Sequence, residues 1–161
     1  MFDGALTWLQ GLSFPTAVRE SSWLFQTIET VHVFALVLVV GSIVTVDLRL
    51  LGLANRDRPF TQLAKEMLPW TWVSFAVAAV AGLMMFSSKA TVYFSNIPFR
   101  IKMACLLLAG INMMVFHVVG MREVIAWDTS VPPRHARVAG GASLLLWTLI
   151  VATGRWIGFT T

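Results

Sequence analysis

Four long apolar runs constrain this 161-residue chain more than any other feature. A helix needs about 20 predominantly apolar residues to cross a hydrocarbon core of roughly 30 Å, and four stretches approach that length. We therefore predict an all-α, polytopic membrane protein built as a bundle of four transmembrane helices. The predicted spans are residues 23–53, 63–87, 98–127 and 133–159.

The composition excludes several other classes of protein. Only 12% of residues are charged and 57% are hydrophobic, which is far from the balance of a soluble globular domain. The net charge is +4, but the aromatic residues lie within the apolar runs and are not interleaved with a basic stripe, so we expect no nucleic-acid partner. A single cysteine, Cys105, excludes an intrachain disulfide and a thiolate metal cluster.

The segments outside the spans are short. No loop is long enough to form another domain, so residues 1–161 are predicted to form one transmembrane domain. The apolar residues before residue 23, with a break at Ser13–Pro15, predict a short N-terminal helix at the membrane interface. Lys and Arg are more numerous in the first and third loops than on the opposite side, which favours an outside location for both termini.

Ionisable residues within the spans are the best pointers to function, because each costs several kcal/mol in hydrocarbon by insertion scales. Glu29 and His32 are three residues apart and share one face of the first span, and Asp47 follows His32 by about 22 Å along the helix. Lys102 and His117 have the same spacing on the third span, which runs parallel to the first.

If the first and third spans face each other, these residues form two layers. The outer tier combines Glu29, His32 and Lys102, and Arg155 reaches it from the end of the fourth span. The inner tier places Asp47 near His117, with Arg49 as another partner for Asp47. One haem clamped between His32 and His117 is excluded, because axial nitrogens lie about 4 Å apart and the two depths differ by roughly 15 Å.

Each tier has more than one interpretation. The sequence Glu29-Thr-Val-His32 matches the Glu-x-x-His unit of di-iron bundles, but no second unit exists, so a salt bridge from Glu29 to Lys102 or Arg155 is favoured. Tyr93 and Asn96 could roof a pocket at the outer tier or cap helix ends.

His117 is a candidate metal ligand in the inner tier. Thioether and imidazole groups suit Cu(I) or haem iron, whereas a hydrogen bond to Asp47 with methionines in ordinary packing is the simpler interpretation. The candidate metal ligands are His117, Met113, Met114 and Met121.

Small residues predict close helix packing. Gly82, Gly110, Gly140 and Gly141 each lie near an alanine and give smooth helix faces. These faces can pack within one bundle or between protomers. Because a bundle of this size buries little surface, we expect a homo-oligomer or a place in a larger membrane complex.

A series of motifs runs in order from end to end of the chain. They are Glu-x-x-His in the first span, Asp47–Gly52, Pro69-Trp70, Gly82–Phe86, Lys102, Asn112–His117, Trp127-Asp128 and Gly154-Arg155. On these motifs the whole chain resembles a family of small bacterial inner-membrane proteins classed as a domain of unknown function. In its number of helices and its intramembrane histidines, the chain is also similar in layout to the membrane domain of copper-resistance D proteins. The resemblance implies a four-helix bacterial inner-membrane protein, and no established activity comes with it.

Three functions follow as hypotheses. The first is a redox membrane subunit for electron transfer that binds haem b or quinone through the candidate cofactor residues His32, His117, Glu29, Lys102, Asp47 and Arg155. The second is a copper-handling or transport protein, and the third is a structural or assembly subunit. An independent enzyme is not expected, because no nucleophile–base pair, phosphate loop or metalloprotease motif occurs in the sequence. The first hypothesis is preferred, since structural bundles seldom need six ionisable groups at membrane depth.

Overall fold

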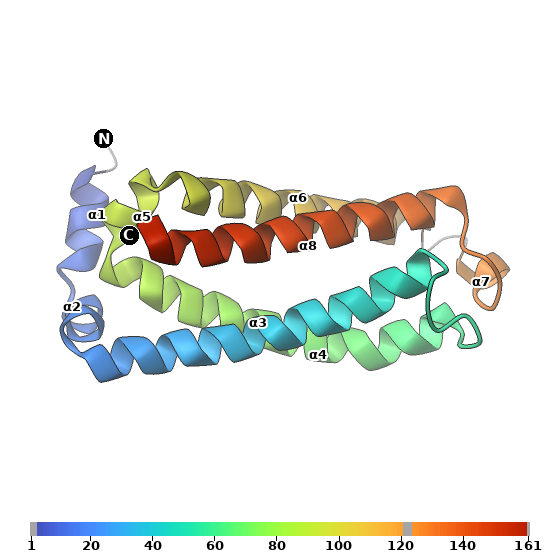
Figure 1. Cartoon of the computed structure of the whole chain (residues 1–161), viewed down its shortest axis with the longest axis horizontal. Coiled ribbons are helices and arrows are strands. Elements are labelled where there is room, and N and C mark those ends of the chain that lie inside the picture. Colours follow the sequence, from blue (N-terminus) through green and yellow to red (C-terminus); the bar gives the residue numbers. More distant parts are fainter. Residues whose placement is uncertain (1–2, 121–123, 161) are drawn as a thin grey trace.

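The computed structural model describes residues 3–120 and 124–160, and its regular elements in these ranges are α-helices (Figure 1). Two short helices, α1 (Asp3–Gln10) and α2 (Ser13–Glu20), precede the long helices. The remaining helices are α3 (Ser22–Leu50), α4 (Phe60–Ser88), α5 (Ala90–Ser95), α6 (Ile97–Val119), α7 (Val124–Trp127) and α8 (Arg134–Thr160).

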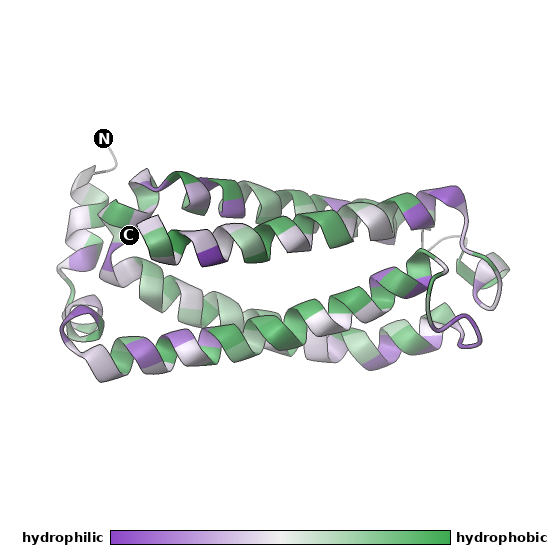
Figure 2. Cartoon of the chain, in the orientation of Figure 1, coloured by the Kyte–Doolittle hydropathy of each residue, from purple (hydrophilic) through white to green (hydrophobic). Residues whose placement is uncertain are grey.

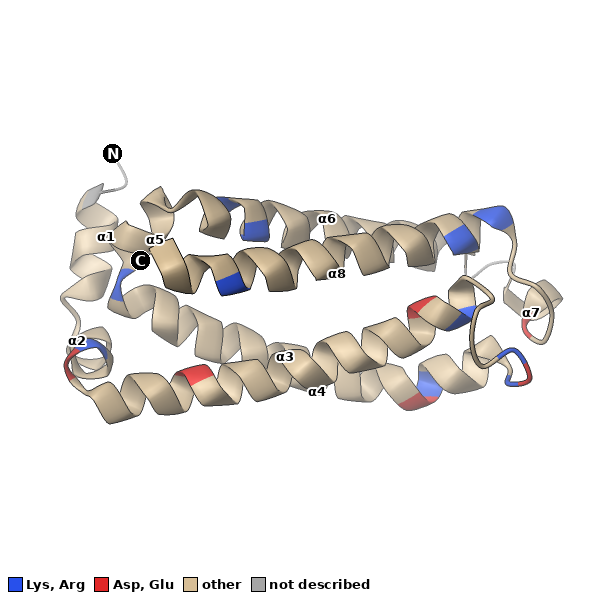
Figure 3. Cartoon of the chain, in the orientation of Figure 1, with Lys and Arg blue, Asp and Glu red and all other residues tan. Residues whose placement is uncertain are grey.

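Four of these helices, α3, α4, α6 and α8, are long and apolar enough to cross a membrane. The prediction of an all-α polytopic bundle is confirmed, and the chain is a multi-pass membrane protein. Hydrophobic residues cover most of the length of the four helices in Figure 2, and charged residues gather toward their ends and in the loops in Figure 3. This distribution is expected when the middle of each helix lies in hydrocarbon.

The third predicted span is too long by one short segment. It was expected to run to residue 127, but α6 ends at Val119 and α7 forms a separate turn of helix. The reason is tertiary packing: Val124 and Trp127 are buried in a cluster with Leu50 and Phe60, which places α7 against the ends of α3 and α4. The ring centroids of Phe60 and Trp127 lie 5.3 Å apart.

The predicted interfacial helix at the N-terminus is divided into two. α1 ends at Gln10 and α2 begins at Ser13, where the sequence indicated a break. α1 packs against α5, and the Gln10 side chain hydrogen-bonds the Thr91 side chain there. α2 packs against α3 and α4, and its Val18 is fully buried in a cluster with Ile28 and Ala81. The two short helices therefore cover the end of the bundle that carries both termini (Figure 1).

The long helices associate as two pairs, α3 with α4 and α6 with α8. α3 and α8 lie close together near α7 and separate toward the end that carries both termini (Figure 1). A central cluster joins α3 to the other pair, because Val39 packs with Cys105 of α6 and with Trp147 and Ile150 of α8. Within the α3–α4 pair, Thr71 donates a hydrogen bond of 2.7 Å to the Ser42 hydroxyl.

Candidate functional site

The end of α3 near α7 forms a well-defined helix C-terminus. Gly52 has a φ of +71°, its N–H donates to the carbonyl of Arg49 at 3.0 Å, and the N–H of Leu53 donates to the carbonyl of Leu48 at 2.9 Å. These bonds make a Schellman motif, in which a left-handed glycine ends the helix. The glycine that ends the Asp47–Gly52 motif is therefore explained by its role at the C-terminus of α3.

Arg49 ties the loops together at this end of the bundle. Its side chain is 1% exposed, and it donates to the carbonyls of Arg58 at 3.1 Å and Asp128 at 2.7 Å. The Asp128 carboxylate in turn accepts from the backbone N–H and the hydroxyl of Thr61. Arg49 therefore joins the α3–α4 loop to the segment after α7, and the alternative in which it pairs with Asp47 is not formed.

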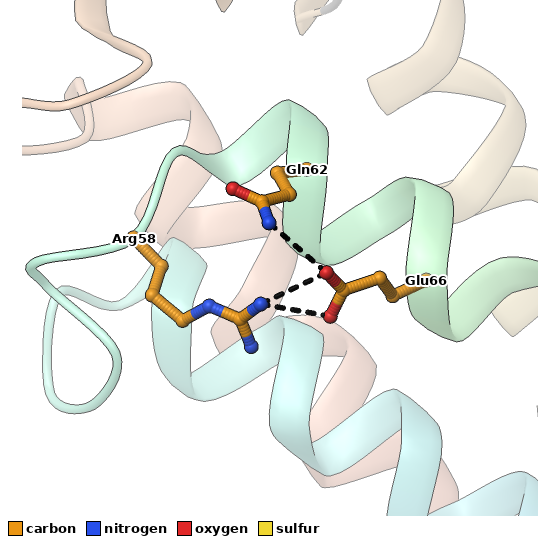
Figure 4. A network of polar contacts seen from close by, with 3 residues as sticks. All are labelled: Arg58, Gln62 and Glu66. Carbon is orange, nitrogen blue, oxygen red and sulfur yellow. Dashed lines mark hydrogen bonds and ion pairs between the residues drawn. The ribbon is translucent and has the colours of Figure 1, made fainter.

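A surface ion pair lies beside this clamp. Arg58 donates to both carboxylate oxygens of Glu66 at 2.8 and 2.9 Å, and Gln62 donates to the same carboxylate (Figure 4). This ion pair joins the α3–α4 loop to α4. Since both side chains are about 40% exposed, we expect it to contribute little to stability.

Asp47 faces α8, and the inner tier is not assembled as expected. Asp47 is 4% exposed and lies beside the Ser143 side chain, and Oδ2 has no hydrogen-bond partner in the described part of the chain. His117, by contrast, is exposed on α6. The reason is the close approach of α3 to α8 at Gly140, where an added Cβ would lie only 3.1 Å from the Asp47 carbonyl oxygen. α8, not α6, therefore supplies the neighbours of Asp47.

The candidate metal ligands lie away from the core. Met113, Met114 and His117 are exposed on α6, and Met121 lies outside the described residues. No group of three or more His, Cys, Asp or Glu residues that could hold a metal ion occurs among the described residues. The copper site stays a prediction, and it rests on an outward-facing stripe of α6.

His32 is the most defined residue of the outer tier. It is half-buried, and its Nδ1 lies 2.7 Å from the carbonyl oxygen of Ala78 on α4. Because a carbonyl only accepts, Nδ1 carries the proton, and in the neutral ring Nε2 keeps its lone pair. Gly82 permits this arrangement, since an added Cβ there would lie 3.1 Å from Cε1 of His32.

Lys102 is the residue of the outer tier that α6 contributes. Its half-buried side chain runs along α8 at Gly154, where an added Cβ would lie 3.4 Å from Nζ. Lys102 and Glu29 both lie close enough to His32 to interact with it electrostatically. Figure 3 shows the acidic stretch in the first half of α3 and basic stretches on α6 and α8 at the same end of the bundle.

The expected salt bridges of Glu29 are not formed, and Arg155 does not join the tier. Arg155 is exposed, and its guanidinium lies 5.0 Å from the centroid of the Phe159 ring, a cation–π contact on the outside of α8. Glu29 is exposed as well and lines an open pocket of about 440 Å³ along α3. The outer tier therefore consists of Glu29, His32 and Lys102, with Tyr93 near Glu29.

A glycine lies beside each of three ionisable residues within the spans. Gly82 contacts His32, Gly140 contacts the backbone of Asp47, and Gly154 contacts Lys102. Sequence reasoning identified two of these glycines only as smooth packing surfaces and did not connect them with the polar residues. Gly82 and Gly154 occur in the same end-to-end series of motifs as His32 and Lys102, and this signal could have connected them.

Tyr93 offers a direct test of the outer tier. Burial raises the pKa of Tyr93 above its usual 10.0, and the negative charge of Glu29 raises this pKa further, because both disfavour the tyrosinate. The chain contains a single tyrosine, so the ultraviolet absorbance of tyrosinate reports this residue alone. We expect a titration midpoint above 10.0 that falls, but stays above 10.0, in Glu29→Gln. Glu66→Gln at the other end is the control, and an unchanged midpoint in Glu29→Gln would place Glu29 away from Tyr93.

The comparisons with known proteins bear on the family to which the chain belongs. No curated protein and no solved structure matches the chain. The model of a family of unknown function, DUF6644, matches residues 21–160, and the chain belongs to that family.

Proposed function

We propose that the protein is a redox-associated subunit of the bacterial inner membrane that binds haem b or a quinone at the outer tier. The observation that carries this proposal is the hydrogen bond from Nδ1 of His32 to the carbonyl of Ala78. Histidines that bind a metal or cofactor usually have their other ring nitrogen fixed in this way by a carbonyl or carboxylate. The bond leaves Nε2 as the atom that meets a ligand.

The residues around His32 fit a cofactor better than a structural salt bridge. A purely structural tier would pair Glu29 with Lys102, yet the two carry no ion pair in the described part of the chain. Imidazole Nε2 is an axial ligand of b-type haem and a hydrogen-bond acceptor for a quinol hydroxyl. The ammonium of Lys102 is a donor for a haem propionate or a quinone carbonyl.

The inner tier is proposed to be structural. Asp47 is enclosed by α8, and Arg49 is saturated by loop carbonyls, so neither is placed to meet a cofactor. Copper handling is retained as a second candidate, because Met113, Met114 and His117 share the exposed face of α6.

The placement in the cell and the assembly are proposed as well. The excess of Lys and Arg near α7 favours periplasmic termini in an inner membrane. The long helices are largely exposed in the single chain, so lateral association into a homo-oligomer or a larger complex fits them.

Absorption spectroscopy tests the proposal directly. Protein purified in mild detergent is recorded oxidised and dithionite-reduced, and its iron, copper and lipid-soluble quinone are measured in the same sample. We expect either a Soret band with iron or co-purified quinone, and loss of that cofactor in His32→Gln. Glutamine keeps an N–H donor for the Ala78 carbonyl, so this variant should still fold.

His135→Ala is the control, since His135 lies in the first turn of α8 at the opposite end of the bundle and should not affect cofactor content. Wild-type protein free of haem and quinone contradicts the proposal, and copper bound in proportion to protein and lost in His117→Ala would favour the second candidate.

A further inference from the structure

We infer that the outer tier binds the headgroup of a quinone or quinol that arrives from the hydrocarbon core beside α3. In this arrangement Nζ of Lys102 donates to a quinone carbonyl, and Nε2 of His32 accepts from a quinol hydroxyl. This inference rests on the proposed function and narrows the choice of cofactor, because the proposed function allows haem b as well as a quinone.

The water-facing end of the tier is closed by packed side chains. Asn96 caps α6 by accepting from the N–H of Phe99 at 3.1 Å, and its amide donates to the hydroxyl of Thr160 at 2.8 Å, which fastens the α5–α6 junction to the end of α8. Phe86 and Phe99 stack with centroids 5.4 Å apart, and Tyr93 packs on Phe99. α1 and α2 pack against the same end of the bundle, so this end is covered by side chains and short helices.

The flank of α3 that carries Glu29 is open, since Glu29, Val33 and Phe34 are exposed there. Glu29 and Asp47 are 18 residues apart, which is five helical turns, so they share one flank of α3. Asp47 faces α8, and Glu29 therefore lies on the same flank in the region where α3 and α8 separate (Figure 1). An open pocket of about 440 Å³ along this flank is lined by residues of α3 alone, which are Gln26, Glu29, Thr30, Val33 and Phe34. Its lining combines polar groups with apolar side chains that face lipid, which suits a headgroup attached to an apolar tail.

Different polar atoms of the outer tier complement the quinone and the quinol. An ammonium group donates and cannot accept, whereas the Nε2 lone pair of a neutral imidazole accepts. A quinone carries only acceptors and a quinol also carries donors, so Lys102 should matter most for the oxidised form and His32 for the reduced form. Haem would not divide the roles of the two residues in this way, because the iron needs its axial imidazole and a propionate needs its partner in both oxidation states.

The test measures binding of decylubiquinone and of its quinol to the full chain in nanodiscs. Wild-type protein should bind both. Lys102→Met should weaken binding of the quinone by about tenfold or more, which corresponds to one lost charged hydrogen bond, and His32→Gln should do the same for the quinol. Val33→Trp should reduce binding of both forms, because it fills the pocket.

The matched control is Val37→Trp, one turn further along α3. Val33 and Val37 are both exposed, at 52% and 63%, so either tryptophan is tolerated by the fold, but only Val33 lines the pocket. Equal binding by the two tryptophan variants overturns the inference. Haem-containing protein that binds neither probe overturns it as well and leaves the proposed function standing, whereas protein with neither haem nor quinone binding overturns both.

Discussion

Replacing Gly140 with alanine is expected to destabilise the folded protein by about 1–3 kcal/mol, the usual cost of overpacking a tight contact. The new Cβ would lie 2.9 Å from Cβ of Leu50 and 3.1 Å from the carbonyl oxygen of Asp47. Neither atom belongs to the flexible end of a side chain, so α3 and α8 must move apart. The measurement is the thermal unfolding midpoint in one detergent, with the yield of monodisperse protein as a second readout.

The neighbouring glycine supplies a matched control for this variant. In Gly141→Ala the nearest atom to the new Cβ is Cδ2 of Leu51 at 3.8 Å, an ordinary contact. Because alanine favours a helix over glycine by up to about 1 kcal/mol, this variant should be as stable as the wild type or slightly more stable. Equal midpoints for Gly140→Ala and Gly141→Ala would mean that α8 does not approach α3 at Gly140.

Replacing Arg49 with methionine is expected to cost about 2–4 kcal/mol. The substitution keeps the apolar stem but leaves the carbonyl of Arg58, which is partly buried with this bond, without its donor, and an unsatisfied buried group costs about 1–3 kcal/mol. The carbonyl of Asp128 loses its 2.7 Å bond to Arg49 and keeps the N–H of Phe60 at 3.0 Å. Chemical or thermal unfolding in detergent measures this loss, and proteolysis of the α3–α4 loop should become faster.

Arg58→Met is the comparison for that experiment, since it removes a cation from the same end of the bundle. Its ion pair with Glu66 is exposed, so the change should cost at most about 1 kcal/mol. If both arginine variants lose the same stability, then the buried hydrogen bonds of Arg49 do not hold the loops together.

Length and hydropathy were enough to predict the fold. The number of membrane-spanning helices and the resemblance to a family of unknown function are both confirmed, while the likeness to copper-resistance D proteins stays a prediction. The end of α6 could not be predicted, because residues 98–127 read as one apolar run. The structure ends the helix at Val119, and Trp127 then packs on Phe60, 67 residues earlier in the chain.

The candidate site was predicted in part. The spacing of three residues predicted that Glu29 and His32 share one face of α3. The position of Lys102 along its own helix predicted that it lies at the same depth. The prediction that His117 lies near Asp47 was wrong, because residue spacing gives the depth along a helix but not which helix lies beside it. That choice depends on Gly140, whose missing side chain lets α8 reach α3. The roles of His32, Lys102 and the methionine stripe stay predictions.

The contact between Asp47 and Gly140 also bears on how the chain enters the membrane. About ninety residues separate the two positions, so at roughly 5–20 residues per second the ribosome needs about 5 to 20 seconds to complete α8 after α3 has emerged. During that interval Asp47 lacks the helix that encloses it. A membrane insertase that shelters α3 until α8 arrives would shorten the exposure of this carboxyl to lipid, and the yield of the protein should therefore depend on the supply of such a factor.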